Sequence, residues 1–205
     1  ADGLDLHFGN AEAMVELTRK ICEREGIGDM LAEGPRHVAE QLGAKTTKFM
    51  MTVKNQNLPM HECRARHGQA LGYAVSPTGA DHMHNFWDQS VATEPLSEAV
   101  QSLGIYEPIP PTELSPRKVR AYTYGANWSW VHNHVCNCMY VPWTREQLVE
   151  MLNVITGWSV TTWELLKTSE RSTTMARLLN LREGLSRDDD QLPERLFSSV
   201  GDYPG

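Results

Sequence analysis

Helix start and stop signals divide the chain, and between them apolar residues recur at helical spacing. Ser115 precedes Pro116, which combines an N-cap with proline at the first helical position. Thr144 and Gln147 form a capping-box pattern, and Gly157 supplies the end of that helix. No segment shows the sustained alternation of a strand, and there is no internal repeat. The sequence therefore predicts an all-α protein.

These start and stop signals predict helices in two parts of the chain, one before residue 46 and one after residue 115. They cover residues 11–25, 29–43, 116–140, 144–156 and 160–183. Asn10 caps the first helix and Gly26 ends it, whereas Gly34-Pro35 bends or splits the second. Residues 46–85 have no sustained period, and the Pro-rich residues 94–116 are predicted to be a surface loop. We expect residues 1–50 to end one helical domain and residues 51–205 to form a second, unless the two are one continuous helical unit.

Composition narrows the class of protein. The 205 residues are long enough for one or two domains, and 22% are charged with a net charge of -7. Because the chain is acidic and has no basic patch, we expect no nucleic-acid binding. The sequence contains no run of about 20 apolar residues, so it predicts no membrane span. Four cysteines and no secretory signal favour a reducing, cytoplasmic compartment. The first residue is not Met and the end has loop composition, so we expect a fragment of a longer chain.

The stretch "HNHVCNC" places a metal-capable side chain at every second position: His132, His134, Cys136 and Cys138. On a helix, residues two apart point about 200° from one another. The four side chains therefore do not share one face, and a self-contained zinc site is not favoured. A stand-alone helical metal-binding module nevertheless stays open as an alternative. Cys136 is interpreted as a structural cysteine, and Cys22 as a small core residue.

Three long stretches resemble one family closely: "GLDLHFGNAEAMVELTRKICEREGIGDMLAEG", "ALGYAVSPTGADHMH" and "LLNLREGLSRDDDQLPERL". They are similar to the C-terminal helical region of the aldehyde ferredoxin oxidoreductases, over residues 3–197. The resemblance implies an oxidoreductase that converts an aldehyde and water to a carboxylic acid. It implies tungsten, or molybdenum, held by two molybdopterin-type pterins, and a [4Fe–4S] cluster that passes electrons to ferredoxin. It also implies a β-rich N-terminal domain outside this chain, without which the fragment is expected to be inactive.

The resemblance also implies roles for residues in "NHVCNCMY". The family pattern Asp-x-x-Gly-Leu-Cys, followed by an aromatic residue, is similar to this stretch. Cys138 is then the cluster ligand, and Tyr140 is the aromatic residue. Asn133 replaces the pterin-contacting Asp, while Cys136 and Asn137 replace Gly and Leu. We expect Asn133 and Asn137 to contact the cofactor, although an Asn loses the charge-assisted part of such a contact.

The segment "GADH" resembles the family's Gly-x-x-His segment, which implies proton transfer by His82. A histidine can exchange a proton near neutral pH, which suits the oxidation of a hydrated aldehyde. Two departures bear on the substrate, because Asn57 and Thr78 stand where many relatives have an acidic residue and Arg. The alternative function is therefore a related tungsten enzyme with another redox substrate, such as an aromatic coenzyme A thioester.

Overall fold

The computed structural model describes residues 2–199 and divides into two compact units, the first ending at Met51 and the second beginning at Thr52. The first unit is helical, with α1 packed against α2 and α2 against α3. Its elements are α1 (Ala11–Glu23), α2 (Ile27–Ala32), α3 (Pro35–Leu42) and the 3₁₀ helix η1 (Ala44–Phe49). Assignment of the two units to successive family domains stays a prediction.

Local signals explain the helices of the first unit, with one correction. The Asn10 side chain accepts a hydrogen bond from the Ala13 amide, as expected of an N-cap. The helix ends at Glu23 because Arg24 adopts a left-handed conformation (φ 56°), so the prediction that it ends at Gly26 was wrong. The Gly34-Pro35 pair was predicted to bend or split the second helix, and it splits it, since α2 ends at Ala32 and Pro35 begins α3.

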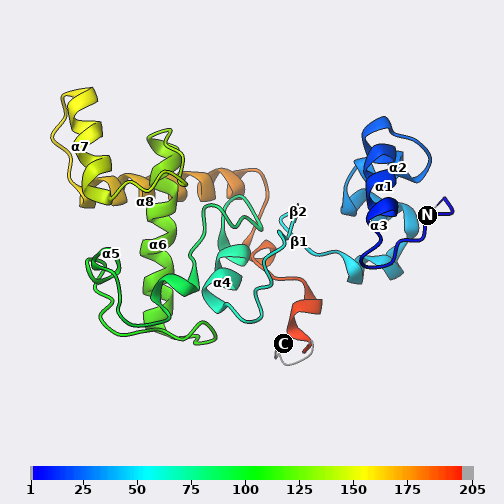
Figure 1. Ribbon diagram of the computed structural model, residues 1–205, viewed down its shortest axis with the longest axis horizontal. Coiled ribbons are helices and arrows are strands. Elements are labelled where there is room, and N and C mark those ends of the chain that lie inside the picture. Colours follow the sequence, from blue (N-terminus) through cyan, green and yellow to red (C-terminus); the bar gives the residue numbers. More distant parts are fainter. Residues whose placement is uncertain (1, 200–205) are drawn as a thin grey trace. The chain divides into compact units, whose positions relative to one another are not determined.

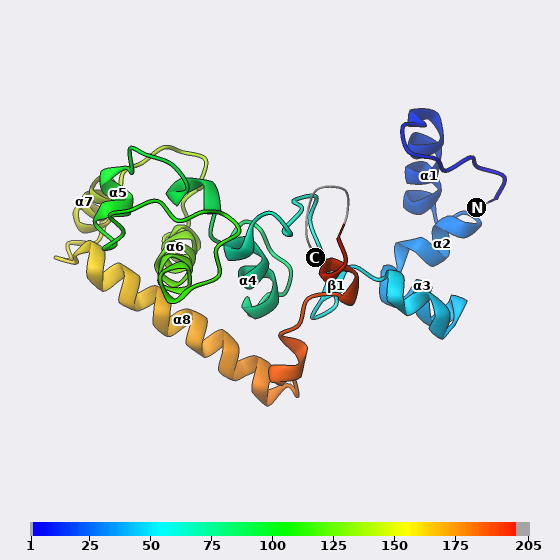
Figure 2. The same ribbon diagram turned by 90° about the horizontal axis from the view of Figure 1, so that it is seen from below.

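The second unit is also helical, apart from one short hairpin (Figure 1). Its elements are β1 (Thr52–Val53), β2 (Gln56–Asn57), α4 (His67–Val75), η2 (Asp88–Val91), α5 (Glu98–Gln101), α6 (Pro116–His134), α7 (Arg145–Thr156), α8 (Thr162–Arg182), η3 (Arg187–Asp189) and η4 (Glu194–Phe197). The long helix α8 crosses α6, and α4 and α7 pack against α6 and α8 respectively (Figure 2). The predicted all-α class is confirmed. Within residues 2–199, no helix is long and apolar enough to cross a membrane.

The caps of the longer helices agree with the sequence patterns. Ser115 accepts from the Lys118 amide at the start of α6, and Thr144 and Gln147 form the capping box of α7. Gly157 ends α7 in the left-handed conformation (φ 72°). The prediction for α6 was wrong at its C-terminal end, because the helix stops at His134 and the residues up to 140 form turns.

Helix α4 lies within the stretch that was predicted to be irregular. The Asp88 carboxylate accepts hydrogen bonds from the Gly68 and Gln69 amides, so the cap of α4 comes from a distant residue. Gly72 is required by close packing, because a Cβ there would lie 1.7 Å from the Asn85 side-chain oxygen. These contacts bring residues 85–88 directly against α4.

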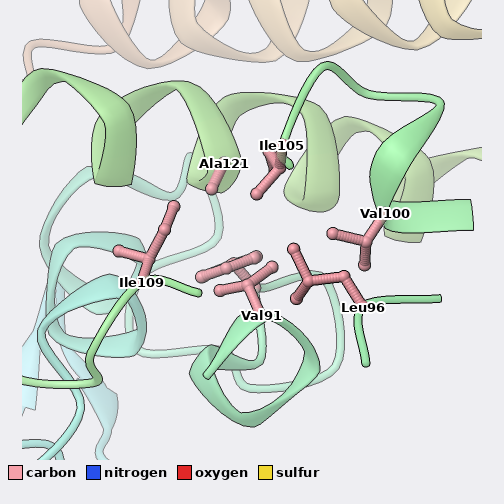
Figure 3. Close-up of a cluster of buried hydrophobic side chains, with 7 residues drawn as sticks. Val91, Leu96, Val100, Ile105, Ile109 and Ala121 are labelled. Carbon is pink, nitrogen blue, oxygen red and sulfur yellow. The ribbon is translucent and has the colours of Figure 1, made fainter. Parts of the chain in front are cut away.

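The Pro-rich segment contributes to the core, so the prediction that residues 94–116 lie over the surface was wrong. Figure 3 shows its apolar side chains meeting those of the preceding residues and α6. The cluster contains Phe86, Val91, Leu96, Val100, Ile105, Ile109 and Ala121. A second cluster, Val131, Leu148 and Leu165, joins α6, α7 and α8. The two clusters fix α6 as the central support of the unit.

A buried ion pair links the same elements. Lys118 and Asp88 have side chains with 0% exposure, and the Lys118 ammonium donates to the Asp88 carboxylate. Asp88 therefore has three donors, which compensate for the loss of its hydration. The pair ties the segment that follows Trp87 to the start of α4 and to α6.

Candidate active site

A tight turn after α4 presents two of the loop histidines in different directions. The Asp81 carboxylate accepts from the Met83 amide at 2.7 Å and pairs with Nδ1 of His84. The Thr78 hydroxyl lies 3.5 Å from the same carboxylate. This turn places His82 and His84 beside separate groups of side chains.

His84 connects the loop to the end of α6. Its Nδ1 meets Asp81, its Nε2 meets the side-chain amide of Asn133, and its ring stacks on Trp130 at 4.5 Å. The Asp81 hydrogen bond raises the pKa of His84, and partial burial opposes that rise. Burial acts to raise the pKa of Asp81, but the hydrogen bonds from His84 and Met83 outweigh it and lower the pKa. The Asp81 carboxylate is therefore held ionised, with the hydrogen on Nδ1 of His84 facing it.

His82 belongs to a different group, formed with His61 and Trp87. The His61 and His82 ring centroids are 4.8 Å apart, and the Trp87 ring lies edge-on to both, 5.0 Å from His61 and 6.3 Å from His82. Burial and the neighbouring His82 lower the pKa of His61. His61 is therefore kept neutral beside His82.

The turn after α6 carries the remaining predicted residues. Cys136 adopts a left-handed conformation (φ 54°), and the Asn137 amide donates to the His132 carbonyl at 2.8 Å. The Asn137 side chain meets Nδ1 of His132 at 3.0 Å, and the His132 ring lies edge-on to Trp128. Asn137 thus supports the turn from within, and its role in cofactor binding stays a prediction.

Cys138 is exposed on this turn with a free thiol. Cys136 is also exposed, as is Cys22 in the first unit, so the predictions of structural, core-like cysteines at these two positions were wrong. The Tyr140 hydroxyl donates to the Met83 sulfur at 3.8 Å, which is a second contact between this turn and the histidine loop. The Cys138 thiol and the Asn133 side-chain amide are both exposed, so a cofactor outside the core of this chain could contact them.

The alternating pattern "HNHVCNC" does not form a metal site by itself. Across residues 2–199, no three His, Cys, Asp or Glu side chains are grouped so that they could hold a metal ion. His134 stacks on Trp130 at 6.2 Å, whereas His132 faces Trp128. A single cluster ligand at Cys138, with the others supplied from elsewhere, is compatible with this arrangement.

Sequence reasoning selected His82 and Asn133 but missed the residues that position them. Asn133 is joined to His84, and His84 to Asp81, whereas His82 is joined to His61. The i, i+3 spacing of Asp81 and His84 in "DHMH" is a sequence signal for their pairing. The contact between His84 and Asn133 spans 49 positions and has no local signal. Asn57, in β2, pairs with Thr52 in the hairpin.

A cavity of about 800 Å³ reaches one side chain of the His82 group, Trp87. Trp87 lines it and also contacts His82, while Trp128 lines it and contacts His132. The Arg145 guanidinium stacks 5.0 Å above Trp128 and donates to the Ser102 hydroxyl at 2.9 Å. Apolar side chains supply most of the wall, which is typical of a cavity that binds an apolar or aromatic molecule.

Known proteins are similar to this sequence over nearly its whole length. The family described as aldehyde ferredoxin oxidoreductase, domains 2 and 3, matches residues 1–204. Tungsten-containing aldehyde ferredoxin oxidoreductases of Pyrococcus abyssi and Pyrococcus furiosus are 32% and 31% identical over 93% and 96% of this chain. The chain spans 30% and 31% of their respective lengths.

A relative named for a different activity also matches. An aliphatic sulfonate oxidoreductase, WOR-like subunit, of Pyrococcus furiosus is 27% identical over 98% of this chain, which spans 30% of that relative. The family match covers both units and agrees with the all-helical fold. The chain belongs to the aldehyde ferredoxin oxidoreductase family.

Proposed function

We propose that the full-length protein carrying this chain is a cytoplasmic tungsten-pterin enzyme that oxidises an aldehyde and water to a carboxylic acid. Each turnover releases two electrons and two protons, and the electrons pass through a [4Fe–4S] cluster to ferredoxin. Family membership and the tungsten-containing relatives support this proposal. The observation that carries it in this chain is the direct contact between the histidine loop and the end of α6.

The residues of this chain have separate roles in the proposal. Cys138 provides one thiolate to the cluster, and its exposure and free thiol suit that role. Asn133 and Asn137 belong to the cofactor side, with Asn133 exposed at the surface of α6. The bound tungsten-pterin group supplies the two-electron redox chemistry.

His82 is proposed to accept a proton released by the hydrated aldehyde. Its ring lies beside the neutral His61 and the edge of Trp87, which limits its contact with water on that side. The cavity against Trp87 is proposed to receive the body of the substrate, which favours apolar and aromatic aldehydes.

The test is an assay of the full-length protein on a panel of aldehydes, with a viologen dye as electron acceptor and tungsten and molybdenum measured per chain. We expect aromatic aldehydes to reduce the dye, and we expect His82→Gln to lower kcat by about a hundredfold or more. His7→Gln is the control, because His7 is exposed and pairs only with the exposed Asp5 within the described residues. The proposal fails if no aldehyde is oxidised while an aliphatic sulfonate or an aromatic acyl thioester is turned over.

A further inference from the structure

Asp81, His84 and Asn133 form a hydrogen-bonded chain whose polarity can be deduced. A carboxylate only accepts hydrogen bonds, so Nδ1 of His84 must carry a hydrogen where it meets Asp81. In the neutral ring, Nε2 is then the acceptor, and Asn133 must donate from Nδ2. The Oδ1 atom of Asn133 is left to accept from another group.

Protonation of His84 reverses the second contact. Both ring nitrogens then donate, and Asn133 must turn its side chain so that Oδ1 accepts from Nε2. The Asn133 amide nitrogen, with its two hydrogens, is left to face outward. The charge of His84 therefore decides whether Asn133 offers an acceptor or a donor to its surroundings.

We propose that His84 is a positioning residue that sets the orientation of the Asn133 side-chain amide. When His84 is neutral, the Asn133 oxygen accepts a hydrogen bond from an N–H group of the pterin; when His84 is charged, the amide turns and this hydrogen bond is lost. This inference rests on the proposed function, in which Asn133 contacts the pterin. It explains how an asparagine can serve at the position where the family resemblance implies an aspartate. The neutral state of His84 fixes the amide with its oxygen outward, in the place of the carboxylate oxygen.

The surroundings of His84 make its charge adjustable. Asp81, in the same loop, is 14% exposed and favours the charged ring, and a charged His84 in turn lowers the pKa of His134 in α6. Trp130 covers one face of the ring, and the turn after α6 contributes Tyr140 against the neighbouring Met83. The hydrogen bond from His84 to Asp81 raises the pKa of the ring above its ordinary value.

The test measures how much pterin and tungsten the full-length protein keeps during dialysis between about pH 6 and pH 9, a range that extends upward from the ordinary histidine pKa because the pKa of His84 is raised. We expect cofactor loss to be about tenfold faster at the acidic end, the size of effect seen for residues that support a metal centre from behind. In His84→Gln, which forms hydrogen bonds without taking a charge, retention should not depend on pH. In Asn133→Asp, which presents only acceptors, retention should stay high at low pH.

His134→Phe is the matched control, because His134 also stacks on Trp130 but forms no hydrogen bond with the Asn133 side chain among the described residues. It should keep the pH dependence of the unsubstituted protein. The inference is overturned if His84→Gln keeps that dependence, if His134→Phe removes it, or if the unsubstituted protein shows none. A full-length protein that never carries tungsten or pterin rejects the proposed function itself, which distinguishes the two failures.

Discussion

Replacement of Lys118 by Met is expected to destabilise the second unit strongly. Methionine replaces the unbranched apolar stem of Lys118 in α6 but removes the charge that faces Asp88. The side chains of Lys118 and Asp88 both have 0% exposure. The two backbone donors from Gly68 and Gln69 remain, yet they do not neutralise a buried carboxylate. Removing one partner of such a pair costs about 3–5 kcal/mol of the free energy of unfolding.

The assay is urea unfolding of the 205-residue chain, followed by tryptophan fluorescence. With a denaturant dependence of about 2 kcal/mol per molar urea, the midpoint should fall by about 2 M. Lys167→Met is the matched control, because Lys167 pairs with Glu170 at the surface, with exposures of 45% and 53%. The control should change stability by less than about 1 kcal/mol. Equal midpoints for the two variants would refute the reasoning.

Two further predictions follow from the pKa shifts. The pKa of His84 is higher in the folded protein than the value of about 6.5 in the unfolded chain. The charged His84 therefore stabilises the fold fully at a pH below the unfolded pKa, and this stabilisation is lost as the pH rises through the folded pKa. His84→Phe should therefore lower the melting temperature more at pH 6 than at pH 9, and a larger loss at pH 9 would contradict this. Burial raises the pKa of the Cys63 thiol to about 11, so at pH 8 iodoacetamide should modify the exposed Cys22 far faster than Cys63, as measured by mass spectrometry. Equal rates would contradict this burial.

Features that depend on neighbouring residues were predictable from the sequence. The caps at Ser115 and Thr144 and the end at Gly157 each involve residues within one helical turn. Features that depend on distant residues were not. The start of α4 is capped by Asp88, and the burial of Leu96 follows from its packing near α6, so neither is visible in a local pattern.

The candidate site divides in the same way. His82 and Cys138 were selected because the short motifs around them resemble family motifs. The pairing of His84 with Asn133 depends on the packing of a loop against α6, and the exposure of Cys136 depends on where that helix ends. Sequence reasoning therefore identified candidate atoms for the chemistry but not the contacts that orient them.

The iron content of two cysteine variants of the full-length protein tests the central claim most directly. Cys136 and Cys138 are both exposed on the same turn, so each serves as the control for the other. Cys138→Ser should lose the electron paramagnetic resonance signal of the reduced [4Fe–4S] cluster and most of its iron, whereas Cys136→Ser should keep both. A Cys138→Ser protein with an unchanged cluster signal would contradict the assignment.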